Sequence, residues 1–318
     1  MTPFRRAIRI ILLLIGVVVG MTAVIAAYMA RMIIRPPRQR LWATPDELGM
    51  AYEDVQFPAR DGLRLSGWFI PARLEGEQRA KATLILVHGW PWNRLGTAAE
   101  SILSDLPGSA PVQLIHLALA LHRRGYQLLM FDLRNHGLSA ASAPVTFGLR
   151  EADDLLGALD YAAGRDDVAA ERLGVIGFSM GANATLFTLP RTELVQAAVV
   201  VQPMSPSVFA NRYSLRIIGP LTKPVLALVK FLYRLAGGLS FSAMDPIFAA
   251  GGSGEMPVLF IQGNGDTWGS AKNVADMVAV SPTRVEPVYV ETFGRFGGYQ
   301  YAIDHPEILD AFFSKYLA

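Results

Sequence analysis

The hydrophobic and polar positions of this chain first separate an apolar amino-terminal segment from the rest. From Ile10 to Ala30 run 21 residues without a charged side chain. As a helix this segment spans about 31 Å, close to the thickness of a bilayer's hydrocarbon core. A cleaved signal peptide, the alternative, has an apolar region of about 7–15 residues that ends at a small-x-small site. We therefore expect a single-pass anchor within residues 1–35, followed by a proline-rich linker over 36–50.

The second pattern is an alternation of short apolar runs with helical stretches over residues 51–318. The run of alternating residues at Ala51–Phe57 and the next at Leu63–Ile70 flank an Asp61-Gly62 turn, which predicts a hairpin. The later runs alternate with helices, as in a mostly parallel α/β sheet. We predict these later strands at 83–87, 127–131, 172–176, 197–201, 258–262 and 286–290.

The rhythm breaks between Pro203 and Ser253, where an apolar segment, Leu215–Leu239, carries scattered lysines and arginines. We expect an inserted helical lid over residues 203–253. Its mixed apolar and basic surface is compatible with contact with a membrane, and equally with a lid that packs on the core and turns its cations to water. A second insertion is expected at Leu95–Pro111.

The distribution of charged residues is informative only near the expected anchor. The net charge is +2, and the chain has no cysteine. The local basic excess favours phospholipid headgroups, and no basic stripe indicates a nucleic-acid partner. The arginine counts on the two sides of the apolar segment are nearly equal, so the side of the membrane that holds residues 51–318 stays open. These arginines are Arg5, Arg6, Arg9, Arg31, Arg35, Arg38 and Arg40.

The strongest chemical signal is a strand that runs into Gly177-Phe178-Ser179-Met180-Gly181. A serine between two glycines at a strand-to-helix turn is a nucleophile elbow. The glycines at 177 and 181 are needed because the strained turn leaves no room for a Cβ. Ser179 is therefore the candidate nucleophile.

Other candidate residues follow the ends of other predicted strands. His88-Gly89-Trp90-Pro91 follows one strand, and Asp266 follows another within Gly263-Asn264-Gly265-Asp266. Open α/β sheets build their sites beyond the carboxyl ends of their strands. We therefore expect these segments to meet around Ser179.

With these motifs the chain resembles the α/β-hydrolase family, in particular its membrane-anchored esterase and serine-aminopeptidase-like branch, over roughly 51–317. The resemblance also rests on the runs 132–139 and 146–154. It implies an α/β-hydrolase fold with an eight-stranded, mostly parallel sheet. It also implies that Asp266 orients a histidine base, and that the backbone N–H groups of Trp90 and Met180 form the oxyanion hole. It implies no cofactor, and we see no metal site.

The histidine base does not fall where the resemblance places it. Counting back eight residues from Pro306 gives Gly298, and His305 is the only histidine after Asp266. In one interpretation the glycine-rich loop lets His305 reach Ser179. In the other, His305 is simply a polar residue at the start of the last helix. The remaining histidines have structural explanations; His88 and His136 are expected to brace loops.

Two functions follow. The first is a membrane-anchored serine hydrolase that cleaves an ester, thioester or amide of a small-molecule or lipid-like acyl substrate through an acyl-enzyme on Ser179. The second is a catalytically degenerate α/β-hydrolase that binds a ligand or a protein. An acyltransferase would use the same residues, with water excluded from the acyl-enzyme.

Overall fold

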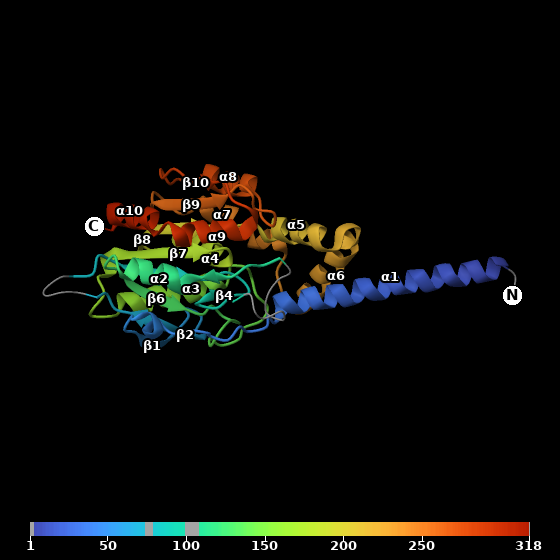
Figure 1. Cartoon of the computed structure of the whole chain (residues 1–318), viewed down its shortest axis with the longest axis horizontal. Helices are drawn as coiled ribbons and strands as arrows, with labels where there is room; N and C mark the ends of the chain where they lie inside the picture. The colour runs from blue at the N-terminus through green and yellow to red at the C-terminus, as the bar shows by residue number, and fades with distance from the viewer. Residues whose placement is uncertain (1–2, 74–78, 99–107, 318) are drawn as a thin grey trace.

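The computed structural model describes residues 3–73, 79–98 and 108–317. Its centre is an eight-stranded sheet in the order β1-β2-β6-β3-β7-β8-β9-β10 (Figure 1). The strands are β1 Glu53–Pro58, β2 Arg64–Ile70, β3 Thr83–Val87, β6 Gln127–Phe131, β7 Leu173–Phe178, β8 Val195–Val201, β9 Val258–Gly263 and β10 Val288–Val290. This is the predicted α/β-hydrolase fold, and each predicted strand is present.

The strands from β6 to β10 are parallel, β1 runs in the same direction, and only β2 runs against them. β1 and β2 pair as the predicted hairpin, and β2 pairs antiparallel with β6. Gly62 in the hairpin turn has φ 86°, a conformation that favours glycine. β4 (Gly96–Thr97) and β5 (Val112–Gln113) form a separate two-stranded pair in the predicted second insertion, of which residues 99–107 lie outside the described part of the chain.

Helices cover both faces of the sheet, and each face has its own apolar cluster. One cluster includes residues of α3, α4 and α8, and the other includes residues of α2, α9 and α10. Burial on both faces explains why the central strands read as continuous apolar runs. The bounds are α2 Leu114–His122, α3 Glu151–Ala163, α4 Met180–Thr188, α8 Ala271–Val280, α9 Gly294–Asp304 and α10 Pro306–Tyr316.

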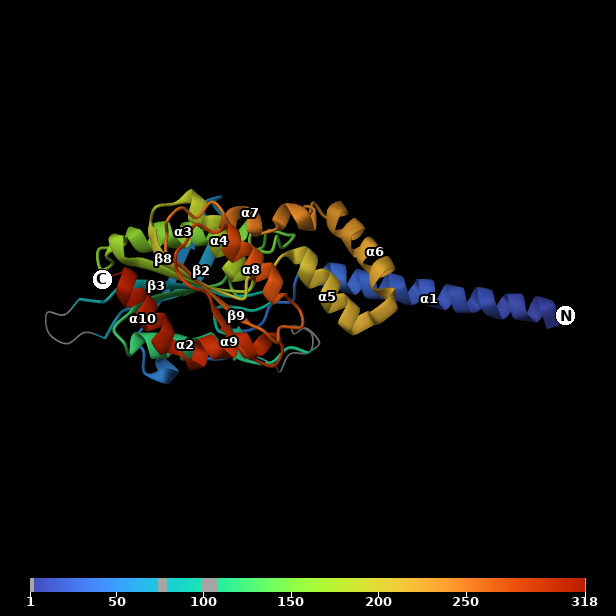
Figure 2. The ribbon, with the colours of Figure 1, turned by 90° about the horizontal axis from the view of Figure 1, so that it is seen from above.

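The predicted insertion forms a lid at the end of the sheet nearest the amino-terminal helix. Its helices are α5 (Pro206–Ile218), α6 (Thr222–Leu235) and the short α7 (Ile247–Ala250). The amino-terminal helix α1 (Pro3–Ile34) extends away from the sheet, with α5 and α6 beside it (Figures 1 and 2). The short 3₁₀ turns are η1 Pro45–Leu48, η2 Ala170–Arg172, η3 Leu189–Arg191, η4 Gly219–Leu221 and η5 Phe241–Met244.

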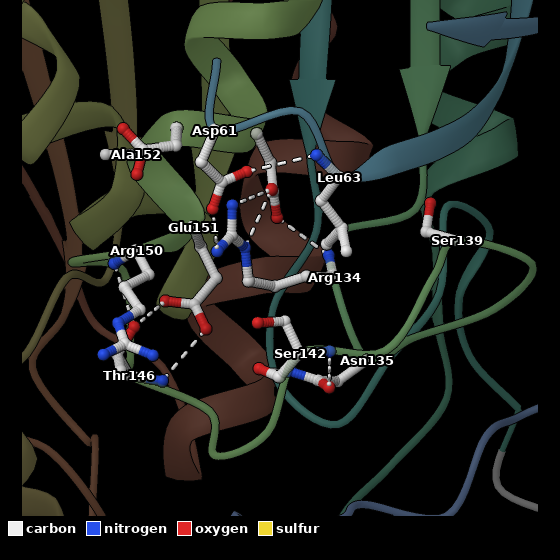
Figure 3. Close-up of polar contacts among 12 residues, drawn as sticks. Asp61, Leu63, Arg134, Asn135, Ser139, Ser142, Thr146, Arg150, Glu151 and Ala152 are labelled. Atoms are coloured by element: carbon white, nitrogen blue, oxygen red, sulfur yellow. Dashed lines mark hydrogen bonds and ion pairs between the residues drawn. The ribbon is translucent and has the colours of Figure 1, made fainter. Parts of the chain in front are cut away.

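Arg134 and Glu151 hold together the loops that lie between β6 and α3. Arg134 binds Asp154 of α3 at 2.7 Å and reaches Asp61 of the hairpin turn at 2.8 Å (Figure 3). Glu151 accepts hydrogen bonds from the backbone N–H groups of Thr146 and Gly148. These contacts tie the 146–150 loop to the start of α3, so the conspicuous polar residues of the 132–139 and 146–154 runs have a structural explanation.

Candidate active site

Ser179 stands at the turn between β7 and α4. Its backbone has φ 54° and ψ −112°, a conformation that is rare for a residue with a side chain. A Cβ on Gly177 would lie 2.5 Å from the carbonyl oxygen of Gly181, and one on Gly181 would collide with the carbonyl of Val87. The flanking glycines are therefore required by close backbone approach, as a nucleophile elbow demands.

The predicted oxyanion side lies against this serine. Met180 is the first residue of α4, so its N–H has no acceptor within the helix. Trp90 follows β3 and lines the same cavity as Met180 and Ser179. A Cβ on Gly89 would lie 3.1 Å from the Cβ of Ser179, which shows how closely this loop passes the serine.

His88 braces the loop that follows β3, and both of its ring nitrogens bond to backbone groups. Its Nδ1 bonds to the carbonyl of Gly89 at 2.7 Å, and its Nε2 accepts from the N–H of Leu133 at 3.0 Å. Burial, reinforced by neighbouring His136, lowers the pKa of His88 to about 3. His136 bonds in the same way to the carbonyl of Arg134. Both histidines therefore have the bracing role expected from sequence.

Asp266 lies just beyond β9, as the sequence predicts. Its Oδ1 accepts from the backbone N–H groups of Trp268 at 2.9 Å and Gly269 at 2.8 Å. Its Oδ2 forms an ion pair with the guanidinium of Arg295. The side chain of Asp266 is only 1% exposed, so this carboxylate is held in one orientation.

Arg295, at the start of α9, occupies the place between Asp266 and Ser179. Its Nη1 donates to Asp266, and its Nη2 donates to the Oγ of Ser179 at 3.2 Å and to the carbonyl of Gln202 at 2.7 Å. The backbone carbonyl of Arg295 in turn accepts from the side chain of Gln202 at 2.6 Å. A guanidinium thus makes the two contacts that a base imidazole would make with the acid and the serine.

The electrostatics of this cluster keep the arginine charged. Burial opposes the charge of Arg295, but the carboxylate of Asp266 outweighs it, and the pKa of Arg295 is raised. Arginine has no acceptor and does not lose its proton in proteins. Tyr299, against the same guanidinium, is also buried, and burial raises the pKa of its phenol to about 12. Neither Arg295 nor Tyr299 can take a proton from Ser179 at neutral pH.

His305 lies elsewhere. It is the residue between α9 and α10, and its side chain is 45% exposed. Its Nδ1 bonds to Glu307 at 2.9 Å, and its ring lies 4.3 Å from that of Tyr301. Ten residues of helix separate it from Arg295, a length of about 15 Å. The structure therefore brings Ser179 and Asp266 together and does not bring His305 to them.

Gly298, where counting from Pro306 placed the base, faces Gln202 rather than Ser179. A Cβ there would clash with the side-chain amide of Gln202. Arg295 was not predicted from the sequence, because the family resemblance implies a histidine at a fixed distance before the last helix. The available signal was a lone charge in the otherwise glycine-rich and aromatic segment 293–301, directly after the last strand.

The cavity above Ser179 is small and largely aromatic. Its volume is about 30 Å³, the space of one or two waters. Arg295 and Ser179 supply its polar floor, and aromatic side chains supply its walls. These are Trp90, Trp92, Phe147, Phe209, Trp268, Phe296 and Tyr299.

Comparison with known proteins agrees with this fold. The model of the alpha/beta hydrolase family matches residues 84–301, more than half of the chain. The chain therefore belongs to the alpha/beta hydrolase family. The Pyrococcus furiosus esterase Pf2001 superposes with a TM-score of 0.69 at 23% identity, over 90% of this chain and 99% of that one. The Pyrococcus horikoshii acylaminoacyl peptidase superposes with a TM-score of 0.56 at 16% identity, over 84% of this chain and 42% of that one. At these identities the likeness concerns the fold.

The relatives with similar sequences match only part of this chain, and the matched region is also only part of each relative. The uncharacterized protein YfhR of Salmonella typhimurium is 37% identical over 134 residues, which is 42% of this chain and 39% of that protein. The polyketide transferase ATR5 of Stachybotrys chlorohalonatus is 25% identical over 161 residues, 50% of this chain and 47% of that protein. The chain thus spans about two fifths to half of the curated relatives described here.

Proposed function

We propose that this protein is a membrane-anchored α/β-hydrolase whose Ser179 site binds the carbonyl end of an acyl compound without fast turnover. The observation that carries this proposal is Arg295, which stands between Asp266 and Ser179 and cannot accept a proton. Attack by a serine hydroxyl requires a group that takes its proton, and loss of that group slows catalysis about 10²–10⁴-fold.

The rest of the site supports binding. The N–H groups of Met180 and Trp90 lie at the wall of the cavity, where they suit a ligand's carbonyl oxygen. The aromatic side chains around them suit an apolar body beside that carbonyl. A small acyl compound or a lipid is therefore the ligand class that we infer.

A slow serine hydrolase is the second candidate, and the strained backbone of Ser179 favours it. A positive φ at a residue other than glycine costs about 1–3 kcal/mol and is concentrated at functional sites. The guanidinium of Arg295, 3.2 Å from Oγ, would also stabilise a serine alkoxide. In that case Ser179 would lose its proton to water and attack the carbonyl, the alcohol, thiol or amine of the substrate would leave with a proton from water, and a second water would hydrolyse the acyl-enzyme.

Labelling with a fluorophosphonate distinguishes the two candidates. We expect the detergent-solubilised wild type to label very slowly, and Arg295→His, which restores an imidazole beside Asp266, to label about 100-fold faster or more. Arg295→Lys, which keeps the positive charge, is the matched control and should stay unreactive. The double variant Arg295→His with Ser179→Ala should not label.

Fast labelling of the wild type would contradict the binding proposal. If the wild type labels as fast as Arg295→His, and Ser179→Ala abolishes the labelling, the protein is a serine hydrolase that works without a histidine base. Hydrolysis of p-nitrophenyl esters by the same variants would then measure its turnover.

Membrane anchoring is the second part of the proposal, and α1 supports it. This helix of 32 residues is long and apolar enough to cross a bilayer, and its most apolar window is only 6% buried. We take residues 1–35 as the anchor, 36–50 as the linker and 51–318 as the hydrolase domain. A protein that stays in the membrane pellet after alkaline carbonate extraction, and whose intact mass includes residues 1–35, would agree; a soluble protein lacking them would contradict it.

A further inference from the structure

A second cavity adjoins the Ser179 cavity on the side of α1. Its volume is about 120 Å³, close to the roughly 150 Å³ of an engineered apolar cavity that stays dry and binds benzene. Its walls come from α1, α5 and α6, and almost all of them are apolar. From α1 these are Ile25, Tyr28, Met29, Met32 and Ile33, and from the lid they include Ala210, Tyr213, Ile217, Leu226 and Val229.

The two cavities share part of their wall, which includes Pro206 at the start of α5. Trp90, Phe147 and Phe209 line both of them. Their rings make edge contacts, with the centroid of Trp90 lying 5.7 Å from that of Phe147 and 6.1 Å from that of Phe209. Passage of a chain from one cavity to the other requires the ring of Phe209, which stacks on Tyr213, to change its rotamer.

The apolar cavity lies where the lid packs on the membrane helix. Ala26, Ala30 and Ile33 of α1 are buried and recur at helical spacing, so one face of this helix rests on the lid. The small side chains at 26 and 30 let α6 approach closely. The lid is therefore held against the helix that we propose to cross the bilayer.

The outer surface of the lid suits a phospholipid surface. Leu215 and Ile217 of α5 and Phe231 and Leu235 of α6 are between 44% and 70% exposed. Residues 204–244 contain no carboxylate side chain. Exposed apolar side chains among cations are typical of a helix at the interface of an anionic membrane. The cations are Arg212, Arg216, Lys223, Lys230 and Arg234.

We propose that the ligand is a long-chain acyl lipid that enters sideways from the bilayer, between α1 and the lid. The part of its hydrocarbon chain nearest the carbonyl occupies the cavity between α1, α5 and α6 and passes Phe209, the carbonyl lies beside Ser179, and the rest of the chain stays in the bilayer. This inference rests on the proposed function for the position of the carbonyl. The position of the chain depends only on the apolar cavity.

Photo-crosslinking tests the position of the chain. The full-length protein is reconstituted in phospholipid nanodiscs with palmitic acid that carries a mid-chain diazirine and a terminal alkyne, and the crosslinks are mapped by mass spectrometry. We expect crosslinks at Trp90, Phe147 and Phe209 as well as on the exposed face of α1. Ala210→Phe, which fills the cavity, should lower the inner crosslinks at least tenfold and leave those on α1 unchanged.

Asn211→Phe is the matched control, since Asn211 is the exposed neighbour of Ala210 on α5. It should leave every crosslink unchanged. Ser214→Leu offers a second way to fill the cavity, because Ser214 is buried there and its hydroxyl has no hydrogen-bond partner among the described residues. A thermal midpoint near that of the wild type establishes that each variant is folded.

Crosslinks confined to the exposed face of α1, or inner crosslinks that survive both filling variants, would overturn this inference. Failure of the proposed function is a separate result, because it is read from fluorophosphonate labelling of Ser179. If the wild type is an active hydrolase and still gives crosslinks in the inner cavity, the lipid enters by the proposed route, and Ser179 cleaves it rather than only binding it.

Discussion

The side chain of Arg295 neutralises a buried carboxylate and also links three parts of the candidate active site by hydrogen bonds. Its guanidinium neutralises Asp266 and holds the backbone of Gln202 while it donates to Ser179. All of these groups are nearly inaccessible to water, so removal of one leaves its partners unsatisfied. Arg295, which makes the contacts that a base imidazole would make, is therefore also part of what keeps this site folded.

Arg295→Met should destabilise the protein by about 3–5 kcal/mol, because it leaves the carboxylate of Asp266 buried without a cation. Adding Asp266→Asn should recover a large part of that loss, since a neutral amide needs no counter-charge. Thermal unfolding followed by tryptophan fluorescence in detergent measures both variants. Equal destabilisation by the single and double variants would mean that the loss does not come from the unpaired carboxylate of Asp266.

The strain at Ser179 is a second prediction at this scale. Ser179→Gly and Ser179→Ala both remove the hydroxyl, but only glycine adopts φ 54° without steric strain. We expect the glycine variant to be more stable than the alanine variant by about 1–2 kcal/mol. Equal stabilities would show that the elbow stores no such strain.

At the scale of elements, α1 and α6 behave as one packed pair. Ala30 is 2% exposed at their contact, whereas Ala27 faces away from it. Ala30→Leu should overpack this contact, at a cost of about 1–3 kcal/mol, and loosen the lid. Ala27→Leu is the matched control and should have no such effect.

Limited trypsin digestion measures that loosening, because the basic residues of α5 and α6 are cleavage sites. Faster cleavage within residues 212–234 in Ala30→Leu, with the wild-type rate in Ala27→Leu, is the expected result. The same rate in all three proteins would mean that the lid does not depend on its contact with α1.

The elements themselves were largely predictable. The strand at 83–87 and the strand at 127–131 coincide with β3 and β6, because fully buried parallel strands read as uninterrupted apolar runs. The position of a base near Pro306 could not be predicted in this way, because it depends on contacts with distant residues. The segment from Thr292 to Gly298, which includes the first turn of α9, is placed by contacts with Gln202 and Asp266. Both are distant in sequence, so the local pattern did not determine which residue faces Ser179.

For the whole molecule, the two buried neutral histidines predict how stability varies with pH. Burial lowers the pKa of His88 to about 3 and also lowers the pKa of His136. In the unfolded chain both groups titrate near 6.5, so below that pH the unfolded state binds more protons than the folded state. Stability is therefore lost as the pH falls below about 6.5, by up to about 1.4 kcal/mol per pH unit for each histidine, and for His88 this loss continues towards pH 3.

The thermal midpoint between pH 7 and pH 5 measures this dependence. His88→Gln cannot take up a proton, so its midpoint should fall less steeply over that range than that of the wild type. A decline as steep in the variant as in the wild type would mean that His88 does not contribute to the acid sensitivity.

By itself the sequence determined the features that depend on local periodicity and local turns. These are the apolar helix Pro3–Ile34, the strand pattern of an α/β sheet, and the elbow whose glycines flank Ser179. Each is specified within about 5–30 neighbouring residues, through burial of one face or through the backbone freedom of glycine.

Only the tertiary structure decided which side chain meets Ser179 and what adjoins its cavity. Arg295 reaches the serine because β7 and β9 end, and α9 begins, at the same edge of the sheet, although 116 residues of chain separate the two side chains. The apolar cavity between α1 and the lid likewise depends on the packing of segments about 180 residues apart. Such packing is set by the shape and charge of distant surfaces, which no local pattern encodes.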